Sequence, residues 1–107
     1  GTATEPGDIA ESHATRQTFG RAIPISSLKS FFGHALGACG SIEAWVGIQM
    51  LREGWVAPTL NLHNPDPRCA DLDYIRDQER PMTCDTFMSN NFAFGGINTS
   101  LIFRIEK

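Results

Sequence analysis

Two side chains that can hold or move protons, Lys29 and His34, lie five residues apart in the stretch SLKSFFGHALGACG, residues 27–40. Small residues follow the histidine, and a run that is typical of a helix begins near residue 38. At the positive end of a helix dipole an imidazole stays neutral, and one ring nitrogen can then donate to a developing oxyanion. A histidine packed beside a turn fits these residues equally well.

Glu43 lies in the most apolar stretch of the chain, residues 38–52, where apolar side chains fall on nearly every face of the expected helix. A helix that is apolar all round is buried, and a buried carboxylate must be paired, neutralised or bound to a cation. Lys29, on the loop that leads to this helix, is the nearest candidate partner. The alternative is an exposed Glu43 and a solvated lysine.

Two further stretches carry candidate binding residues. The opening GTAT places Thr2 and Thr4 at alternate positions, so both hydroxyls point to one side of an extended segment and can bind a ligand that carries amides. The stretch NNFAFGGIN, residues 90–98, places a phenylalanine before Gly95 and Gly96. A mobile loop with an aromatic tip and a tight hairpin with core aromatics both fit, and the residues alone favour the hairpin.

Two helices are expected to position these residues. The first spans residues 8–19, with Asp8 as its cap and Gly20 as its stop. The second spans residues 38–52 and ends at Gly54.

The strands are expected to be short, except near the C-terminus. Residues 22–26 are β-prone but include a proline, and a further short strand is expected over 72–75. Apolar residues alternate over 98–106, which predicts a strand that follows a turn at 95–96. Helices and strands in this order predict a layered α/β or α+β piece.

The bulk composition indicates one globular domain. The chain has 107 residues, of which 41% are hydrophobic and 20% charged. A net charge of −3 argues against nucleic acid or an anionic membrane surface as the main partner. No apolar run approaches the roughly 20 residues that cross a bilayer, and no signal segment opens the chain. Because no initiator Met is present, we expect the chain to be cut from a longer protein.

The three cysteines, Cys39, Cys69 and Cys84, do not read as a disulfide framework. Their number is odd, and reduced thiols in the cytosol are expected. No C-x-x-C pair occurs, and the histidines form no ligand spacing with the cysteines, so no zinc site is expected.

Three ordered stretches closely resemble signatures of the β-ketoacyl-acyl carrier protein synthases, the decarboxylating condensing enzymes of fatty acid and polyketide synthesis. They are GTATEPGD at 1–8, SLKSFFGHALGACGSIEA at 27–44 and SNNFAFGGINTSLI at 89–102. The resemblance implies a thiolase-like α/β fold, with residues 1–107 as the C-terminal part of a synthase domain. Helices packed on a mixed β-sheet are then expected.

The resemblance also implies roles for single residues. His34 matches the second catalytic histidine, which donates to the malonyl thioester oxygen, and Lys29 matches the lysine that orders the histidines. Glu43 matches the acidic residue that pairs with this lysine, and a structural monovalent cation is a candidate beside it. The other matches are two phosphopantetheine-binding hydroxyls, a gating phenylalanine and a glycine-rich loop: Thr2, Thr4, Phe94, Gly95 and Gly96.

The departures from the pattern limit what the chain is expected to do. Neither the family's nucleophilic cysteine nor its first histidine has a match here, so we expect these 107 residues to be inactive alone. Ala3 and Ala93 stand where glycine is common, and a Cβ at position 93 stiffens the loop that carries the gating phenylalanine.

Partners follow from the same resemblance. Acyl carrier protein and acyl and malonyl thioesters are expected, with a homodimeric parent enzyme in the cytoplasm. No cofactor is expected beyond the phosphopantetheine that the carrier protein brings. Two alternatives stay open, namely a non-catalytic carrier-protein or dimerisation module and a coenzyme A-dependent thiolase relative.

Overall fold

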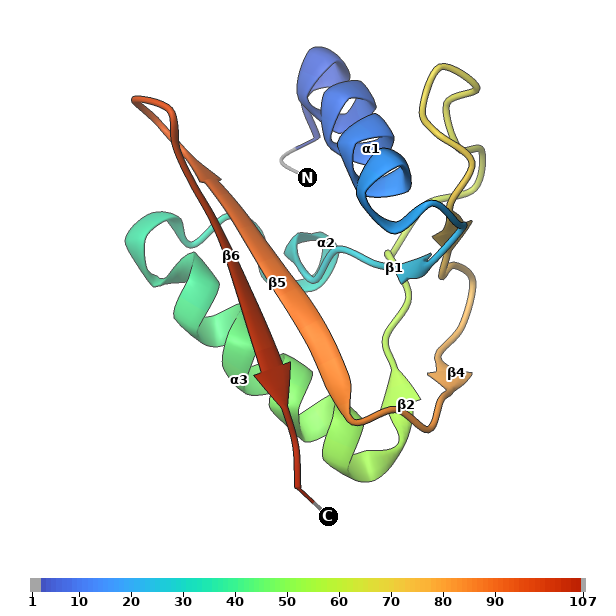
Figure 1. Cartoon of the computed structure of the whole chain (residues 1–107), viewed down its shortest axis with the longest axis vertical. Coiled ribbons are helices and arrows are strands. Elements are labelled where there is room, and N and C mark those ends of the chain that lie inside the picture. The colour runs from blue at the N-terminus through green and yellow to red at the C-terminus, as the bar shows by residue number, and fades with distance from the viewer. Residues whose placement is uncertain (1–2, 107) are drawn as a thin grey trace. The chain divides into compact units, whose positions relative to one another are not determined.

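The computed structural model (Figure 1) describes residues 3–106. These residues divide into two compact units. The first unit holds the described residues through His34 together with Ala57–Glu79, and the second holds Ala35–Val56 and the described residues from Arg80. The elements are, in chain order, α1 (Glu5–Phe19), β1 (Pro24–Ile25), α2 (Lys29–Phe32), the 3-10 turn η1 (Leu36–Ala38), α3 (Cys39–Glu53), β2 (Trp55–Val56), β3 (Asp73–Tyr74), β4 (Arg80–Pro81), β5 (Thr86–Ala93) and β6 (Ile97–Arg104).

Helices combine with both kinds of strand pairing. In residues 3–106, β1 pairs with β3 in parallel, whereas β2 pairs with β4 and β5 with β6 in antiparallel fashion. The α/β class is therefore confirmed. The strands form three two-stranded sheets within the described residues, where one mixed sheet was expected.

Helix α1 begins earlier than the sequence predicts. Its N-cap is Thr4, and Asp8 is not the cap but donates its backbone N–H to the Thr4 carbonyl at 2.9 Å. The difference follows from Pro6, because a proline is well tolerated in the first turn, where its missing N–H costs nothing. The predicted stop is confirmed, since Gly20 adopts φ 68° and caps the helix.

The first unit is joined by contacts between α1, β1 and the loop before β3. The buried Ser12 hydroxyl accepts from the Ala70 backbone N–H at 2.9 Å, so it fastens α1 to that loop. Ile75 follows β3 and donates its backbone N–H to the Ile25 carbonyl at 3.0 Å. Its side chain is the most completely buried of the described residues.

The second unit is built on α3 and the hairpin beside it (Figure 1). The helix spans nearly the predicted range, and Gly54 ends it with φ 80°. Gly47 faces β5 so closely that a Cβ built there comes within 2.6 Å of the Phe87 ring. The expectation of burial on all sides is wrong for Trp45, which is 65% exposed.

The hairpin of β5 and β6 confirms the predicted turn. Ala93 pairs with Ile97, and both glycines between them have positive φ angles, 85° at Gly95 and 77° at Gly96. The opposite end of the hairpin is held by stacked rings of a register pair, Phe87 and Phe103, with centroids 5.0 Å apart.

Four short elements were not predicted, namely α2, η1, β2 and β4. Strands of two residues carry too little alternation to be read from a sequence. Within residues 3–106, no helix is both long and apolar enough to cross a bilayer.

Candidate functional site

The segment that carries Lys29 and His34 is fastened to the loop after Ala57. The backbone N–H of Ser27 donates to Thr59 Oγ1 at 2.9 Å, and the backbone N–H of Leu60 donates to Ser30 Oγ at 2.8 Å. The Ser30 hydroxyl also donates to the Ser27 carbonyl at 2.9 Å. Two serines on either side of Lys29 thus hold this stretch of backbone in place.

One glycine sets the direction of the chain at His34. Lys29 begins the four-residue helix α2, and Gly33 ends it by donating its N–H to the Lys29 carbonyl at 2.8 Å. Gly33 has φ 73° and ψ −171°, a region that is essentially closed to residues with a Cβ. The chain leaves α2 at this angle, and His34 follows as an exposed residue.

The predicted place of His34 at the N-terminal end of the long helix is wrong. Helix α3 begins at Cys39, and the 3-10 turn Leu36–Ala38 precedes it, so His34 lies outside its first turn. The effect of a helix dipole falls off within that turn, so it does not explain a neutral imidazole here. The exposure of His34 disfavours the alternative of a histidine packed in the core.

Glu43 is half-buried on α3 and has a thiol as a partner. Cys39 is 5% exposed, and its Sγ donates to Glu43 Oε2 across 3.4 Å, one helical turn away. The expected pair of Glu43 with Lys29 joins residues of different units and stays a prediction. The cation beside Glu43 also stays a prediction; residues 3–106 contain no group of three His, Cys, Asp or Glu side chains arranged as metal ligands.

Thr4 is exposed at the start of α1, whereas Thr2 lies outside the described residues. The Thr4 side chain makes no capping hydrogen bond, although it occupies the N-cap position. Ala3, which lies between the two threonines, has φ 61° and is therefore not extended as predicted.

Phe94 lies at the tip of the hairpin and is 95% exposed. The hairpin is therefore confirmed, but its aromatic tip is not part of a core. Ala93 ends β5, pairs with Ile97 and has no positive φ, so alanine fits this backbone without strain.

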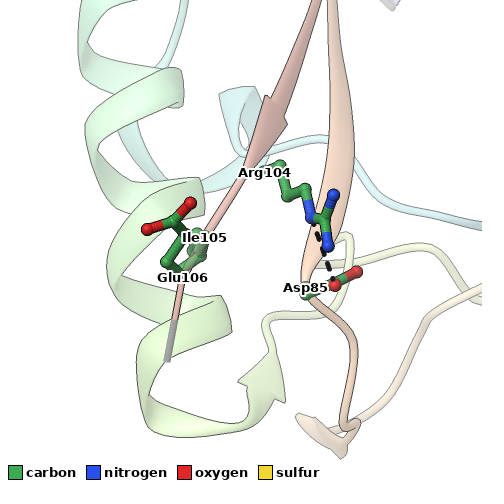
Figure 2. A pocket seen from close by; sticks show the side chains of 4 residues that line it. All are labelled: Asp85, Arg104, Ile105 and Glu106. Carbon is green, nitrogen blue, oxygen red and sulfur yellow. Dashed lines mark ion pairs between the residues drawn. The ribbon is translucent and has the colours of Figure 1, made fainter.

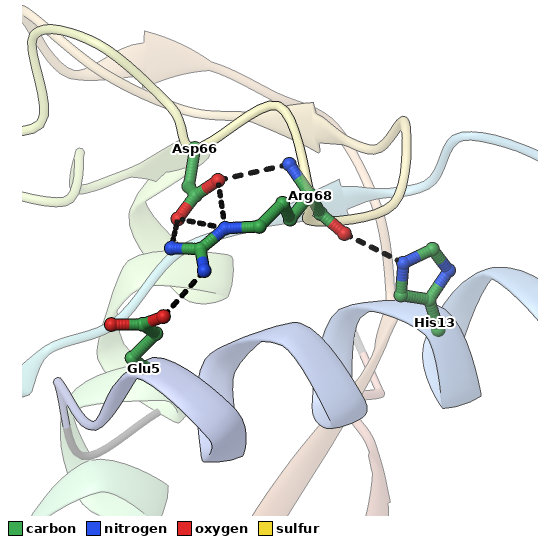
Figure 3. Close-up of polar contacts among 4 residues, drawn as sticks. All are labelled: Glu5, His13, Asp66 and Arg68. Atoms are coloured by element: carbon green, nitrogen blue, oxygen red, sulfur yellow. Dashed lines mark hydrogen bonds and ion pairs between the residues drawn. The ribbon is translucent and has the colours of Figure 1, made fainter.

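The structure adds a polar network in the first unit that the sequence did not indicate (Figure 3). The Arg68 guanidinium binds Glu5 of α1 and Asp66, with Nη2 2.6 Å from Asp66 Oδ2. His13 Nε2 donates to the Arg68 carbonyl at 2.8 Å. The Arg68 side chain lowers the pKa of Asp66 to about 2, and the two carboxylates raise the pKa of Arg68. The network fastens α1 to the loop that contains residues 66–68. No motif or periodicity connects these distant residues.

A shallow pocket in the second unit is lined by Asp85, Arg104, Ile105 and Glu106 (Figure 2). Arg104 Nε lies 3.6 Å from Asp85 Oδ2, and both side chains are largely exposed. The lining offers one ion pair and one further carboxylate, without a nucleophile. None of the residues predicted for the site belongs to it.

The three cysteines are all described, and none forms a disulfide. Cys39 is buried, whereas Cys69 and Cys84 are half-buried. The expectation of free thiols is therefore confirmed.

The chain matches condensing enzymes along its length. Residues 1–63 match the family described as beta-ketoacyl synthase, C-terminal domain. The 3-oxoacyl-[acyl-carrier-protein] synthase 2 of Synechocystis sp. is 45% identical over 107 residues, which cover 97% of this chain and 26% of that protein. The chain thus spans about a quarter of the length of this curated relative.

Solved structures agree with this match. A beta-ketoacyl synthase from Burkholderia phymatum superposes with a TM-score of 0.97 at 62% identity, covering 100% of this chain and 26% of that one. A ketosynthase solved in complex with its type II polyketide acyl-carrier protein, and bound to the hexaketide, superposes with a TM-score of 0.90 at 37% identity. That match covers 97% of this chain and 26% of the ketosynthase.

The thiolase-like α/β fold that the sequence resemblance implied is thereby confirmed. The chain belongs to the β-ketoacyl synthase family and contains sequence of its C-terminal domain.

Proposed function

We propose that this chain acts as the C-terminal part of a 3-oxoacyl-[acyl-carrier-protein] synthase, which elongates acyl chains by decarboxylative Claisen condensation with malonyl-carrier protein. The observation that carries the proposal is the fastened segment with Lys29 at the start of α2 and an exposed His34 after Gly33. It occurs in a chain that matches proteins of this name over nearly its whole length. Residues 64–107 belong to the same functional domain in this proposal.

In the proposed reaction, the bond between the malonyl carboxylate and the α-carbon breaks, and carbon dioxide leaves. The electron pair remains on the α-carbon and is delocalised onto the thioester oxygen. The His34 imidazole donates a hydrogen bond to that oxygen while negative charge develops, and Lys29 orders the histidine. The carbanion then attacks the carbonyl carbon of the acyl group held as a thioester, and the thiolate departs.

The other proposed site residues bind the substrates or orient the residues that act on them. The Thr4 hydroxyl holds the phosphopantetheine arm together with Thr2, and Glu43 supports the lysine. Phe94 closes over the acyl chain, and the two following glycines allow its backbone to approach. The exposed tip position of Phe94 supports this role, because an aromatic side chain there is available to a ligand.

None of the three cysteines suits the role of the nucleophile. Cys39 is buried with its thiol turned to a carboxylate, and neither Cys69 nor Cys84 lies in a matching motif. We therefore propose that the nucleophile comes from synthase sequence beyond these 107 residues and that the chain does not condense thioesters alone. The proposed partner is acyl carrier protein, which a structural relative binds. The proposal also includes a homodimer in the cytoplasm, with no cofactor other than the carrier's phosphopantetheine.

The test is a condensation assay on the full-length protein that carries these residues, with labelled malonyl-carrier protein and an acyl-carrier protein. We expect condensation by the unmodified protein and a loss of about 10²–10³-fold in kcat on His34→Ala, the scale for one oxyanion donor. His63→Ala, a change at a second exposed histidine, is the matched control and leaves the rate unchanged. No turnover by the full-length protein, or equal rates for the two variants, would contradict the proposal.

A further inference from the structure

The side chain of Thr4 lies so close to Gly7 of α1 that a residue with a Cβ at position 7 would collide with it. A Cβ built on Gly7 comes within 2.4 Å of Thr4 Oγ1 and within 3.8 Å of Thr4 Cβ. Real Cβ atoms essentially never approach a neighbour to less than 3.0 Å. Any other residue at position 7 therefore forces the Thr4 hydroxyl out of its rotamer.

Helix formation does not explain this glycine. Glycine is a poor helix former and alanine is the best, yet Gly7 stands in the first turn of a 15-residue helix. Its φ angle is not positive, so the backbone accepts alanine without strain. Within residues 3–106, the close approach that a Cβ would make is to the side chain of Thr4, at the N-cap.

The hydroxyl that Gly7 accommodates is not used by the helix. Thr4 occupies the N-cap position, where a threonine side chain ordinarily accepts from a backbone N–H of the first turn. Here it makes no such bond, and residues 3–106 supply no other hydrogen-bond partner for it. An exposed hydroxyl that caps nothing keeps its donor and its acceptor for a ligand.

We propose that Gly7 is a positioning residue, which keeps the Thr4 hydroxyl in the rotamer that receives an amide of the phosphopantetheine arm. The inference rests on the proposed function, in which Thr4 binds that arm. An amide of the arm presents one N–H and one carbonyl oxygen, and a hydroxyl can bind either. A shift of the hydroxyl by a Cβ at position 7 breaks that bond without touching the reacting atoms.

The first experiment is Gly7→Ala in the full-length protein. We expect KM for malonyl-carrier protein to rise roughly two- to twelvefold, as for the loss of one hydrogen bond, with kcat unchanged. The melting temperature stays equal or rises, because alanine favours the helix. An unchanged KM would overturn the inference. Ala14→Gly, at an exposed position of the same helix, is the control, and it lowers the melting temperature without changing KM.

A double-mutant cycle separates the inference from the proposed function. Thr4→Val removes the hydroxyl and keeps the shape of the side chain, so KM rises over the same range if Thr4 binds the arm. In that background Gly7→Ala then adds nothing, because the group that it displaces is gone. An equal further rise in KM would overturn the positioning role of Gly7. If Thr4→Val leaves KM unchanged, the inference falls together with the role of Thr4, whereas the His34 test of the synthase reaction stands separately.

Discussion

At the scale of single residues, Gly33 sets the course of the chain into His34. Its φ of 73° and ψ of −171° are essentially restricted to glycine, and apart from its chain neighbours a Cβ there meets no atom of residues 3–106 within 4 Å. The constraint is therefore purely one of backbone conformation. Gly33→Ala is expected to lower the free energy of unfolding by about 1–3 kcal/mol, measured by urea denaturation. Gly37→Ala is the control, because a Cβ there likewise meets no described atom beyond its chain neighbours within 4 Å, and its φ is not positive. Equal losses for the two variants would contradict this account.

Asp66 is expected to titrate far below an ordinary aspartate. The hydrogen bonds from Arg68 lower its pKa from 3.8 to about 2 in the folded chain. A folded-state pKa below the unfolded value means that ionised Asp66 favours folding. This contribution is therefore present above about pH 3.8 and is lost as the pH falls through about 2. Carboxyl NMR titration measures the pKa directly. Arg68→Gln returns it toward 3.8, whereas Arg76→Gln, which removes a guanidinium bound to the His63 carbonyl, leaves it low.

At the scale of elements, the helices and strands that were predicted correctly are those in which a pattern of apolar residues continues over many consecutive positions. The helix before Gly54 and the hairpin around Gly95 each extend over eight or more residues, so periodicity and the glycine stops define them. The N-cap of α1 was predicted wrongly. Pro6 and Asp8 are both typical of a helix start, and the helix begins at the earlier position, with Pro6 in its first turn. For the site, the segment around His34 was found from residue types. The hydrogen bonds that hold it come from Thr59 and Leu60, which no local pattern links to it.

The packing of α3 on β5 depends on Gly47. A Cβ at this position comes within 2.6 Å of the Phe87 ring, and the ring is itself stacked on Phe103. Gly47→Ala is expected to cost about 1–3 kcal/mol of stability by overpacking. This exceeds the roughly 0.5–1 kcal/mol that alanine gains over glycine in a helix. Gly40→Ala is the control, since the nearest atom to its Cβ belongs to the polar Asn91 side chain, at 3.1 Å, and not to an aromatic ring. Phe87→Leu in the Gly47→Ala background should recover part of the loss, and additive losses would contradict the steric explanation.

At the scale of the whole molecule, β6 carries apolar residues on both faces. Leu101 is 53% exposed and Ile102 is 68% exposed, and neighbouring residues of a strand point to opposite faces. A strand with this pattern is typical of a sheet that is covered on both sides. Within the described residues, β6 pairs only with β5, and its outer edge has no partner strand. Proteins of this fold that are about four times as long have further chain to cover such a surface.

The isolated 107-residue chain is therefore expected to bind a hydrophobic dye and to self-associate at micromolar concentration, because an unpaired strand edge with exposed apolar residues is a template for association. Ile102→Lys removes apolar area and adds a charge, so it should shift the chain toward the monomer in analytical ultracentrifugation. Asn98→Lys adds the same charge on the same face of β6 without removing apolar area, and it should have the smaller effect. If the two variants shift the chain toward the monomer equally, the association depends on net charge and not on apolar area. If the unmodified chain is monomeric and binds no dye, this surface does not drive association. In the full-length protein, Ile102→Lys should lower the free energy of unfolding more than Asn98→Lys does, because burying an unpaired ammonium costs more than leaving it in water.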